Sequence, residues 1–217
     1  MKNGLTETIF ILDRSGSMGH LTEDTIGGYN AMLEQQKNDP GEAKITTVLF
    51  NDNYYMLHNC VDVNEVSPMT NLDYTAYGMT ALLDAVGMTI DLVGKRLAIT
   101  PEDERPEKVI FVITTDGEEN SSREYTKSKV KEMIEHQQDV YNWTFMFLGA
   151  NIDAVGEAQS LGINTRFARG YTASSRGTES LYSAVADTIS YSKSVSLKEY
   201  ENGDWTEMAS CCLDSIV

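Results

Sequence analysis

The chain alternates between two patterns of hydrophobic and polar positions. Short apolar runs of strand length, such as residues 9–12, are followed by longer segments in which apolar residues recur at helical spacing, as Ile26, Tyr29 and Leu33 do. Strands that alternate with helices in this way predict a doubly wound, Rossmann-like α/β fold. We therefore expect a mostly parallel central sheet with one antiparallel edge strand and with helices on both faces.

The limits of the expected elements follow from the same pattern. Strands are expected at residues 9–12, 45–50, 54–58, 108–115, 143–148 and 165–168. The second and third strands are joined only by Asn51-Asp52-Asn53, which predicts an antiparallel hairpin at one edge of the sheet. Helices are expected around residues 26–33, over 80–99, around 130–137, over 154–161 and around 181–189.

Two of these helices carry more detailed predictions. The helix over residues 80–99 is apolar almost all round, so we expect it to be packed on more than one face. Ser121 and Glu124 have the spacing of a capping box, which predicts the start of the next helix at that point.

Length and composition favour one folded domain. A chain of 217 residues is long enough for one well-buried core, although length alone also allows two domains. Hydrophobic residues make up 41% and charged residues 23%, as in ordinary globular proteins. We interpret residues 1–197 as the domain, and residues 198–217, which have little periodicity, as a tail that is either docked or flexible.

Oxygen-bearing side chains follow the first apolar run. In Asp13-Arg14-Ser15-Gly16-Ser17, one carboxylate and two hydroxyls alternate, so that they can turn toward one point. Hard cations such as Mg²⁺ take oxygen ligands, whereas Zn²⁺ favours His and Cys, which this segment lacks. The same residue types are common in turns, so the segment alone is explained equally well as a strand-to-helix turn with Ser17 as a cap.

Two distant residues favour the metal site over the plain turn. Thr80 lies at the start of an expected helix, and Asp116 directly follows the buried strand over residues 108–115. If this strand is parallel to the first one and adjacent to it, Asp13 and Asp116 reach the same edge of the sheet. The predicted ligands of Mg²⁺, or of Mn²⁺ or Ca²⁺ in its place, are Asp13, Ser15, Ser17, Thr80 and Asp116.

With these residues in this order, the chain resembles the von Willebrand factor A family, whose metal-ion-dependent adhesion site combines D-x-S-x-S with a distant Thr and a distant Asp. The resemblance covers about residues 6–194 and includes all five positions. It implies that Ser15, Ser17 and Thr80 contact the metal directly or nearly so, while Asp13 and Asp116 often act through water. It also implies a protein-binding module, not an enzyme, in which an Asp or Glu of a protein partner completes the metal site.

Charge and cysteine content limit the partners and the location that we expect. The net charge is −16, from 17 basic and 33 acidic residues, which excludes nucleic-acid binding. There is no targeting signal and no run of membrane-helix length, and Cys60, Cys211 and Cys212 form no disulfide framework. We expect a cytoplasmic protein of the intracellular bacterial type, for which the resemblance implies an AAA+ ATPase or a stress-response component as partner.

Two other functions stay open. The first is a metal-assisted hydrolase or phosphatase, because some phosphoryl-transfer enzymes also have one Asp after the first strand and another after a later strand. Against it, Asp13 has no second Asp two residues on, and no Lys or His stands in a motif as general acid or base. The second is a metal that only ties loops together, with the function elsewhere in the chain.

Four residues near the motif have competing interpretations. For Arg14 we favour packing over the loop against pairing with a partner. Asp84 resembles an acidic helix residue of the family, and compensation of the helix dipole explains it equally well. Glu118 and Glu119 are interpreted as solvated loop charges, the alternative being a role behind the metal ligands.

Overall fold

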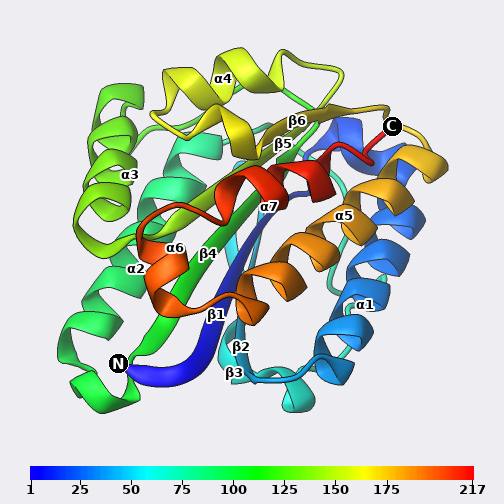
Figure 1. Ribbon diagram of the computed structural model, residues 1–217. Helices are drawn as coiled ribbons and strands as arrows, with labels where there is room; N and C mark the ends of the chain where they lie inside the picture. The colour runs from blue at the N-terminus through cyan, green and yellow to red at the C-terminus, as the bar shows by residue number, and fades with distance from the viewer.

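Six strands form one sheet in the computed structural model, which describes residues 1–217 (Figure 1). The strands are β1 (Lys2–Asp13), β2 (Glu42–Phe50), β3 (Tyr54–Asp62), β4 (Pro106–Thr115), β5 (Thr144–Ala150) and β6 (Ala168–Tyr171). Their order across the sheet is β3-β2-β1-β4-β5-β6, and every neighbouring pair is parallel except β2 and β3. The predicted mixed sheet with one antiparallel edge strand is confirmed.

Helices cover both faces of this sheet. They are α1 (Thr22–Asn38), α2 (Leu82–Ile99), α3 (Lys127–Tyr141), α4 (Ala154–Ser160), α5 (Ser175–Ser194), α6 (Leu197–Glu201) and α7 (Thr206–Leu213). Residues of α1, α5, α6 and α7 share one buried cluster with the sheet, and residues of α2, α3 and α4 share a second cluster on the opposite face (Figure 1). None of these helices combines the length and the apolar character that crossing a membrane requires.

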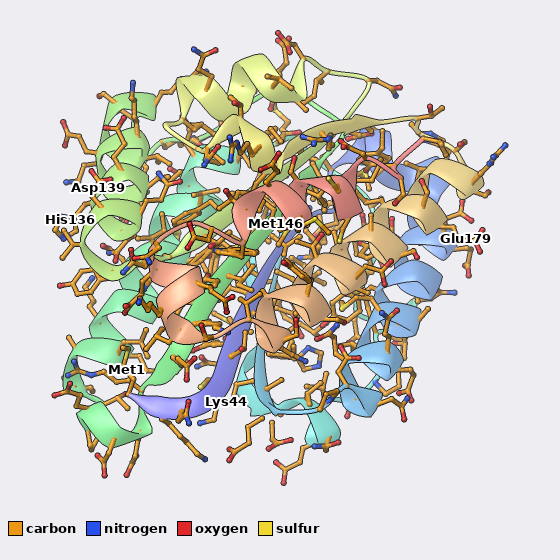
Figure 2. The ribbon with its side chains drawn as sticks, in the orientation of Figure 1. Met1, Lys44, His136, Asp139, Met146 and Glu179 are labelled. Atoms are coloured by element: carbon orange, nitrogen blue, oxygen red, sulfur yellow. The ribbon has the colours of Figure 1, made fainter.

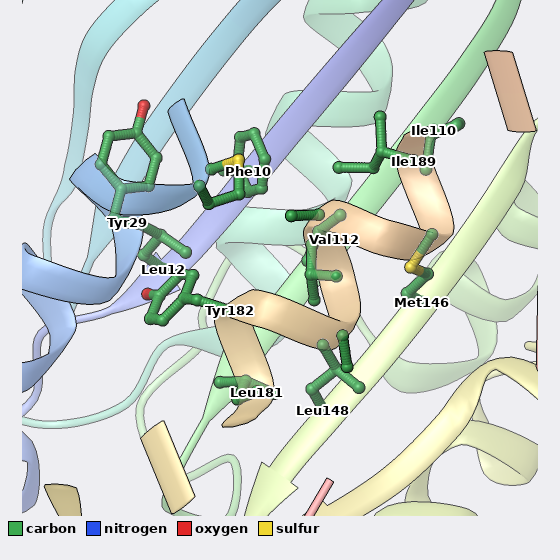
Figure 3. Packing of buried hydrophobic residues seen from close by; sticks show 14 of the residues in the cluster. Phe10, Leu12, Tyr29, Ile110, Val112, Met146, Leu148, Leu181, Tyr182 and Ile189 are labelled. Carbon is green, nitrogen blue, oxygen red and sulfur yellow. The ribbon is translucent and has the colours of Figure 1, made fainter. Parts of the chain in front are cut away.

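The central strand β1 explains the continuous apolar run in the sequence. Phe10 and Leu12 belong to the cluster under α1 and α5, whereas Ile9 and Ile11 belong to the cluster under α2 and α3. All four are fully buried, because successive side chains of a strand point to opposite faces and both faces are covered. Figure 3 shows Phe10 and Leu12 close to Tyr29 of α1.

The last twenty residues, for which the sequence predicted no element, pack on the sheet through α6 and α7. Trp205 is only 3% exposed. Its ring stacks on Tyr200, with 4.8 Å between the ring centres, and its centre lies 5.3 Å from that of Phe167. Leu213 of α7 is fully buried in the same cluster. Isolated helices of this length are only marginally stable in water, so α6 and α7 are stabilised by these contacts with the core.

The capping box predicted at Ser121 and Glu124 is wrong. The N-cap of α3 is Thr126, whose side chain accepts a hydrogen bond from within the helix. The backbone N–H groups of residues 123–125 instead donate to the carboxylate of Asp84, at 2.8, 2.9 and 2.8 Å. This segment is therefore a loop bound to α2, because a carboxylate far away in the sequence supplies its hydrogen-bond acceptors.

The last strand and the buried helix also differ from their predictions. Residues 165–168 begin as the 3₁₀ turn Thr165–Phe167, which the side chain of Asn164 caps, and β6 starts only after this turn. The helix predicted as buried on more than one face is α2, and its last turn is not covered in this way, because Ala98 and Ile99 are exposed, Ile99 by 85%. The loop before α3 covers only the first half of α2.

Candidate metal site

The strand order of the sheet reverses at β1 and β4, which lie side by side at its centre (Figure 1). Ligands of open α/β sheets bind at such a point, outside the carboxyl ends of the strands. Asp13 is the last residue of β1, and Asp116 directly follows β4. Because Leu12 is paired with Thr114, the two strands end at the same level. The structure thus brings both carboxylates to one edge of the sheet.

Asp13 is fully buried, and both of its carboxylate oxygens accept hydrogen bonds. Oδ1 accepts one from the backbone N–H of Ser15 at 2.7 Å, and Oδ2 accepts one from the hydroxyl of Thr115 at 2.6 Å. Burial raises the pKa of Asp13 to about 6, the hydrogen bonds from Thr115 and Ser15 oppose this rise, and the charge of Asp116 adds to it. A carboxylate in this setting is ionised at neutral pH but takes up a proton in mild acid.

Three hydroxyl groups lie close to Asp116. The Oγ atoms of Ser15 and Ser17 are 3.1 Å apart, and the Ser17 hydroxyl donates to Oδ1 of Asp116 at 2.6 Å. A methyl group placed on Gly117 would lie 3.4 Å from Oγ1 of Thr80 and 3.9 Å from Oγ of Ser17. The hydroxyls and this carboxylate therefore meet at one place, next to the buried carboxylate that ends β1.

The loop before α2 carries Thr80 to the site. Gly78 has a φ angle of +79°, in the left-handed region, and a Cβ atom there would lie 1.9 Å from Oδ1 of Asp52. Thr80 and Asn120 are paired in both directions. The N–H of Thr80 donates to Oδ1 of Asn120 at 2.9 Å, and the N–H of Asn120 donates to the carbonyl of Thr80 at 3.0 Å. These bonds join the loop before α2 to the loop after β4.

Three residues at the site were not predicted from the sequence. Thr115 binds the carboxylate of Asp13, as described above, and the hydroxyl of Tyr74 donates to the backbone carbonyl of Asp13. Tyr171 lies near both carboxylates: burial raises the pKa of its hydroxyl, and the charges of Asp116 and Asp13 add to this rise. Only Thr115 had a signal in the sequence, its place at a strand end directly before Asp116. Tyr74 and Tyr171 belong to no motif.

The interpretation of Glu119 as a solvated loop charge is wrong. Its carboxylate accepts hydrogen bonds from the backbone N–H groups of Leu83 at 2.9 Å, Ser121 at 2.9 Å and Ser122 at 2.7 Å. Asp84 binds the next part of the same loop. These two carboxylates therefore fix the loop after β4 against the first turn of α2, which steadies the neighbouring metal-site residues.

The chemistry of the five predicted side chains fits a hard cation. They offer two carboxylates and three hydroxyls, and no group of three or more His, Cys, Asp or Glu side chains in the chain is placed to hold a metal. A cation here would need the hydroxyls and water to complete its shell, as Mg²⁺ readily does. Asp13, Ser15 and Thr80 are buried, Asp116 is half-buried and Ser17 is exposed, so one side of the site faces solvent.

The sequence matches no model of a known protein family and no curated protein. Solved structures do resemble the chain. The vWF domain of the type V pili tip protein Mfa5 from Porphyromonas gingivalis has a TM-score of 0.63 at 12% identity, over 88% of this chain and 97% of that one. The manganese-loaded TRAP protein of Plasmodium vivax has a TM-score of 0.58 at 18% identity, over 79% of this chain and 70% of that one.

A third similar structure is proximal thread matrix protein 1 from the mussel byssus, with a zinc-occupied MIDAS motif. Its TM-score is 0.59 at 16% identity, over 86% of this chain but only 46% of that one, so the chain spans just under half the length of the mussel protein. At such identities the likeness is one of fold. The chain therefore has the fold of a von Willebrand factor A domain.

Proposed function

We propose that the chain is a metal-dependent protein-binding module. Its five site residues hold a divalent cation, and the cation binds an Asp or Glu side chain of a protein partner. The observation that carries this proposal is the convergence of two carboxylates and three hydroxyls at the point where the strand order reverses, with one side open to solvent. The residues with these roles are Asp13, Ser15, Ser17, Thr80 and Asp116.

Each residue contributes in a different way. Ser15, Ser17 and Thr80 would hold the cation directly or nearly so, and the two aspartates would act at least partly through water. When bound, the cation supplies an electrophilic position that accepts a carboxylate oxygen, because two carboxylates neutralise it only roughly and neutral hydroxyls add no charge. Thr115 and the N–H of Ser15 keep Asp13 ionised in its buried position.

The metal and the setting form part of the same proposal. Mg²⁺ is the expected ion, with Mn²⁺ and Ca²⁺ as alternatives, and Zn²⁺ joins the ions to be tested because it occupies the MIDAS motif of the mussel protein. All three cysteines are free thiols, which supports a cytoplasmic location. There the partner would be an AAA+ ATPase or a stress-response component.

No contact in the structure favours a hydrolase. Arg14 and His20, the basic residues within and just after the motif, bind backbone carbonyl groups, those of Asp73 and Ser17. Neither makes a hydrogen bond to Asp13, so neither is placed as a general acid or base for that carboxylate.

The proposal is tested by measuring metal binding and partner binding together. Isothermal titration calorimetry with the four metal chlorides should give binding for the wild-type chain, and Ser15→Ala and Asp116→Ala should weaken it by more than about tenfold. Asp139→Ala is the matched control, because Asp139 is an exposed residue of α3, away from the site (Figure 2). No binding of any of the four ions at millimolar concentration would contradict the proposal.

Partner binding is measured by affinity capture with the full chain, with and without EDTA. Proteins that are retained only with metal, and are lost with Ser15→Ala and Asp116→Ala, would support the proposal. If metal binds but the same proteins are retained in all conditions, the metal is only structural.

A further inference from the structure

The side chain of Arg14 lies between two tyrosine rings beside the metal site. Its Cζ atom is 5.3 Å from the ring centre of Tyr55 and 5.7 Å from that of Tyr77. At these distances the ring faces attract a guanidinium cation. Nη1 of Arg14 also donates a hydrogen bond to the carbonyl of Asp73 at 3.2 Å. We call Arg14, Tyr55 and Tyr77 the tyrosine clamp.

The backbone fixes the tyrosine clamp next to Asp13. The N–H of Arg14 donates to the carbonyl of Phe50 at the end of β2, at 2.7 Å. The carbonyl of Arg14 accepts a hydrogen bond from the N–H of Tyr77 at 3.0 Å. Because both sides of its main chain are bound and its side chain is held by two rings, Arg14 has lost most of its conformational freedom before any partner arrives. Binding a ligand there costs correspondingly less entropy.

The guanidinium of Arg14 has no carboxylate partner in the chain. None of the ion pairs includes it, although acidic residues outnumber basic ones by 33 to 17. Its only hydrogen bond is the one from Nη1. Tyr55 is 45% exposed and Tyr77 is 48% exposed, so the clamp lies at the surface. A guanidinium binds carboxylates well through its planar fork of N–H groups. The Nε of Arg14 is buried without a partner, and its Nη2 makes no hydrogen bond in the chain, so the terminal nitrogens are the donors left for a ligand.

The opposite flank of the metal site is negative. A hollow of about 170 Å³ lies beside Gly117, and its lining includes Glu118, Glu119, Asp153 and Glu157. An anionic ligand is repelled from that flank and attracted toward Arg14, because opposite charges across an interface set its orientation. The two sides of the site therefore differ in charge. The side of β2 and β3 carries the guanidinium of Arg14 together with the carboxylate of Asp52, whereas the side of α4 carries several carboxylates.

We propose that the tyrosine clamp binds a second carboxylate of the same partner. The preferred partner segment then carries two acidic side chains, one for the cation and one for Arg14. This inference rests on the proposed function. It narrows the expected partner segment from one that presents a single acidic side chain to one that presents two. It also explains how a chain of net charge −16 attracts an acidic partner, since Arg14 adds a fixed positive charge beside the cation.

A displayed library of random peptides tests this inference on the full chain. The library is bound in MgCl₂ and released with EDTA, so that only metal-dependent peptides are collected. We expect the released peptides to share one Asp or Glu and a second acid at a fixed spacing from it. The affinity of one such peptide is then measured for the wild type, Arg14→Gln and the control Lys95→Gln. The control loses the same charge near the far end of α2, where Lys95 is 79% exposed.

Arg14→Gln should lower the affinity for the two-acid peptide by about tenfold, and Lys95→Gln should leave it unchanged. Tenfold corresponds to the lower end of the range of free energies for a hydrogen bond to a charged group. When the second acid of the peptide is replaced by its amide, Arg14→Gln should make no further difference. Mg²⁺ affinity should not fall in either variant, because the side chain of Arg14 makes no hydrogen bond to a metal-site residue and the loss of its positive charge only removes a repulsion from the cation.

The outcomes separate this inference from the proposed function. Peptides that need metal but carry a single acid, or that bind Arg14→Gln as tightly as the wild type, would overturn the second contact and leave the metal site standing. If EDTA releases no peptides although Mg²⁺ binds, the proposed function itself fails, and the second contact fails with it.

Discussion

Replacement of Thr115 by valine tests how the chain keeps Asp13 ionised in a buried position. The hydroxyl of Thr115 donates to Oδ2 of Asp13 at 2.6 Å, and both residues are fully buried. Valine has nearly the same shape but no donor. A hydrogen bond to a charged group contributes about 1.5–3 kcal/mol, so the variant should hold the ionised carboxylate less well and raise the pKa of Asp13 further.

The wild-type chain sets the reference for this test. Because the pKa of Asp13 is about 6 without metal, protons and the cation compete for this carboxylate near that pH. At pH 5 roughly one molecule in ten has Asp13 ionised, against roughly nine in ten at pH 7. The affinity for Mg²⁺ should therefore fall about tenfold from pH 7 to pH 5.

In the Thr115→Val variant, the fall in Mg²⁺ affinity should begin at a higher pH than in the wild type. At pH 6.5 we expect Thr115→Val to bind Mg²⁺ about tenfold more weakly than the wild type, because a loss of about 2 kcal/mol leaves Asp13 ionised in only about one molecule in ten at this pH, and to recover most of this loss by pH 8.5. The assay is calorimetric titration with MgCl₂ across this pH range. Thr114→Val is the control, because Thr114 is buried next to Thr115 and its side chain makes no hydrogen bond.

Two results would refute this reasoning. If the wild-type affinity is the same at pH 5 and pH 7, Asp13 does not titrate near pH 6 or does not help to hold the metal. If the Mg²⁺ affinity of Thr115→Val is lower than that of the wild type by the same factor at every pH, the substitution has changed the shape of the site and not the ionisation of Asp13.

Two further predictions concern stability and are measured by urea unfolding. Trp205→Ala should lower the free energy of unfolding by about 3–5 kcal/mol, because Trp205 packs against Tyr200 and Phe167, and a loss below about 1 kcal/mol would mean that the tail adds little to the core. Arg96→Met should cost about 3–5 kcal/mol, because it leaves the buried carboxylate of Glu7 without its cation, and adding Glu7→Gln should restore most of the loss. A double variant as unstable as Arg96→Met would contradict the second prediction.

Much of the fold could be predicted because its central strands are buried on both faces. Such strands appear in the sequence as unbroken apolar, β-branched runs, and the polar residue that ends each run marks the edge of the sheet. The pattern thus places Asp13 and Asp116 each at the end of a buried strand, and it brings them to one edge only if the two strands are adjacent and parallel, as they are. The bond between Thr115 and Asp13 depends on the register of β1 and β4, with Leu12 opposite Thr114, which a single sequence does not reveal.

The parts that could not be predicted depend on contacts between distant segments. Ser121 and Glu124 have the local spacing of a cap, but the N–H of Glu124 donates to Asp84, about forty residues earlier, and the N–H of Ser121 donates to Glu119. The helices α6 and α7 are short and weakly periodic, and their stability comes from Trp205 and its neighbours in the core. Local patterns compete poorly with tertiary contacts of this kind.

The two ends of the chain differ in how near they lie to the metal site. The backbone of Val217 is bound to Thr172, with 3.1 Å between the N–H of Thr172 and the Val217 carbonyl, and Thr172 follows Tyr171, which lies near the two aspartates. The amino end lies far from the site, because the 12-residue strand β1 separates them. At about 3.3 Å per residue, β1 is roughly 40 Å long. Figure 1 accordingly shows the two ends of the chain on opposite sides of the molecule. An affinity tag, a fluorophore or a surface linkage therefore belongs at the amino end, where it leaves the approach of a partner unobstructed.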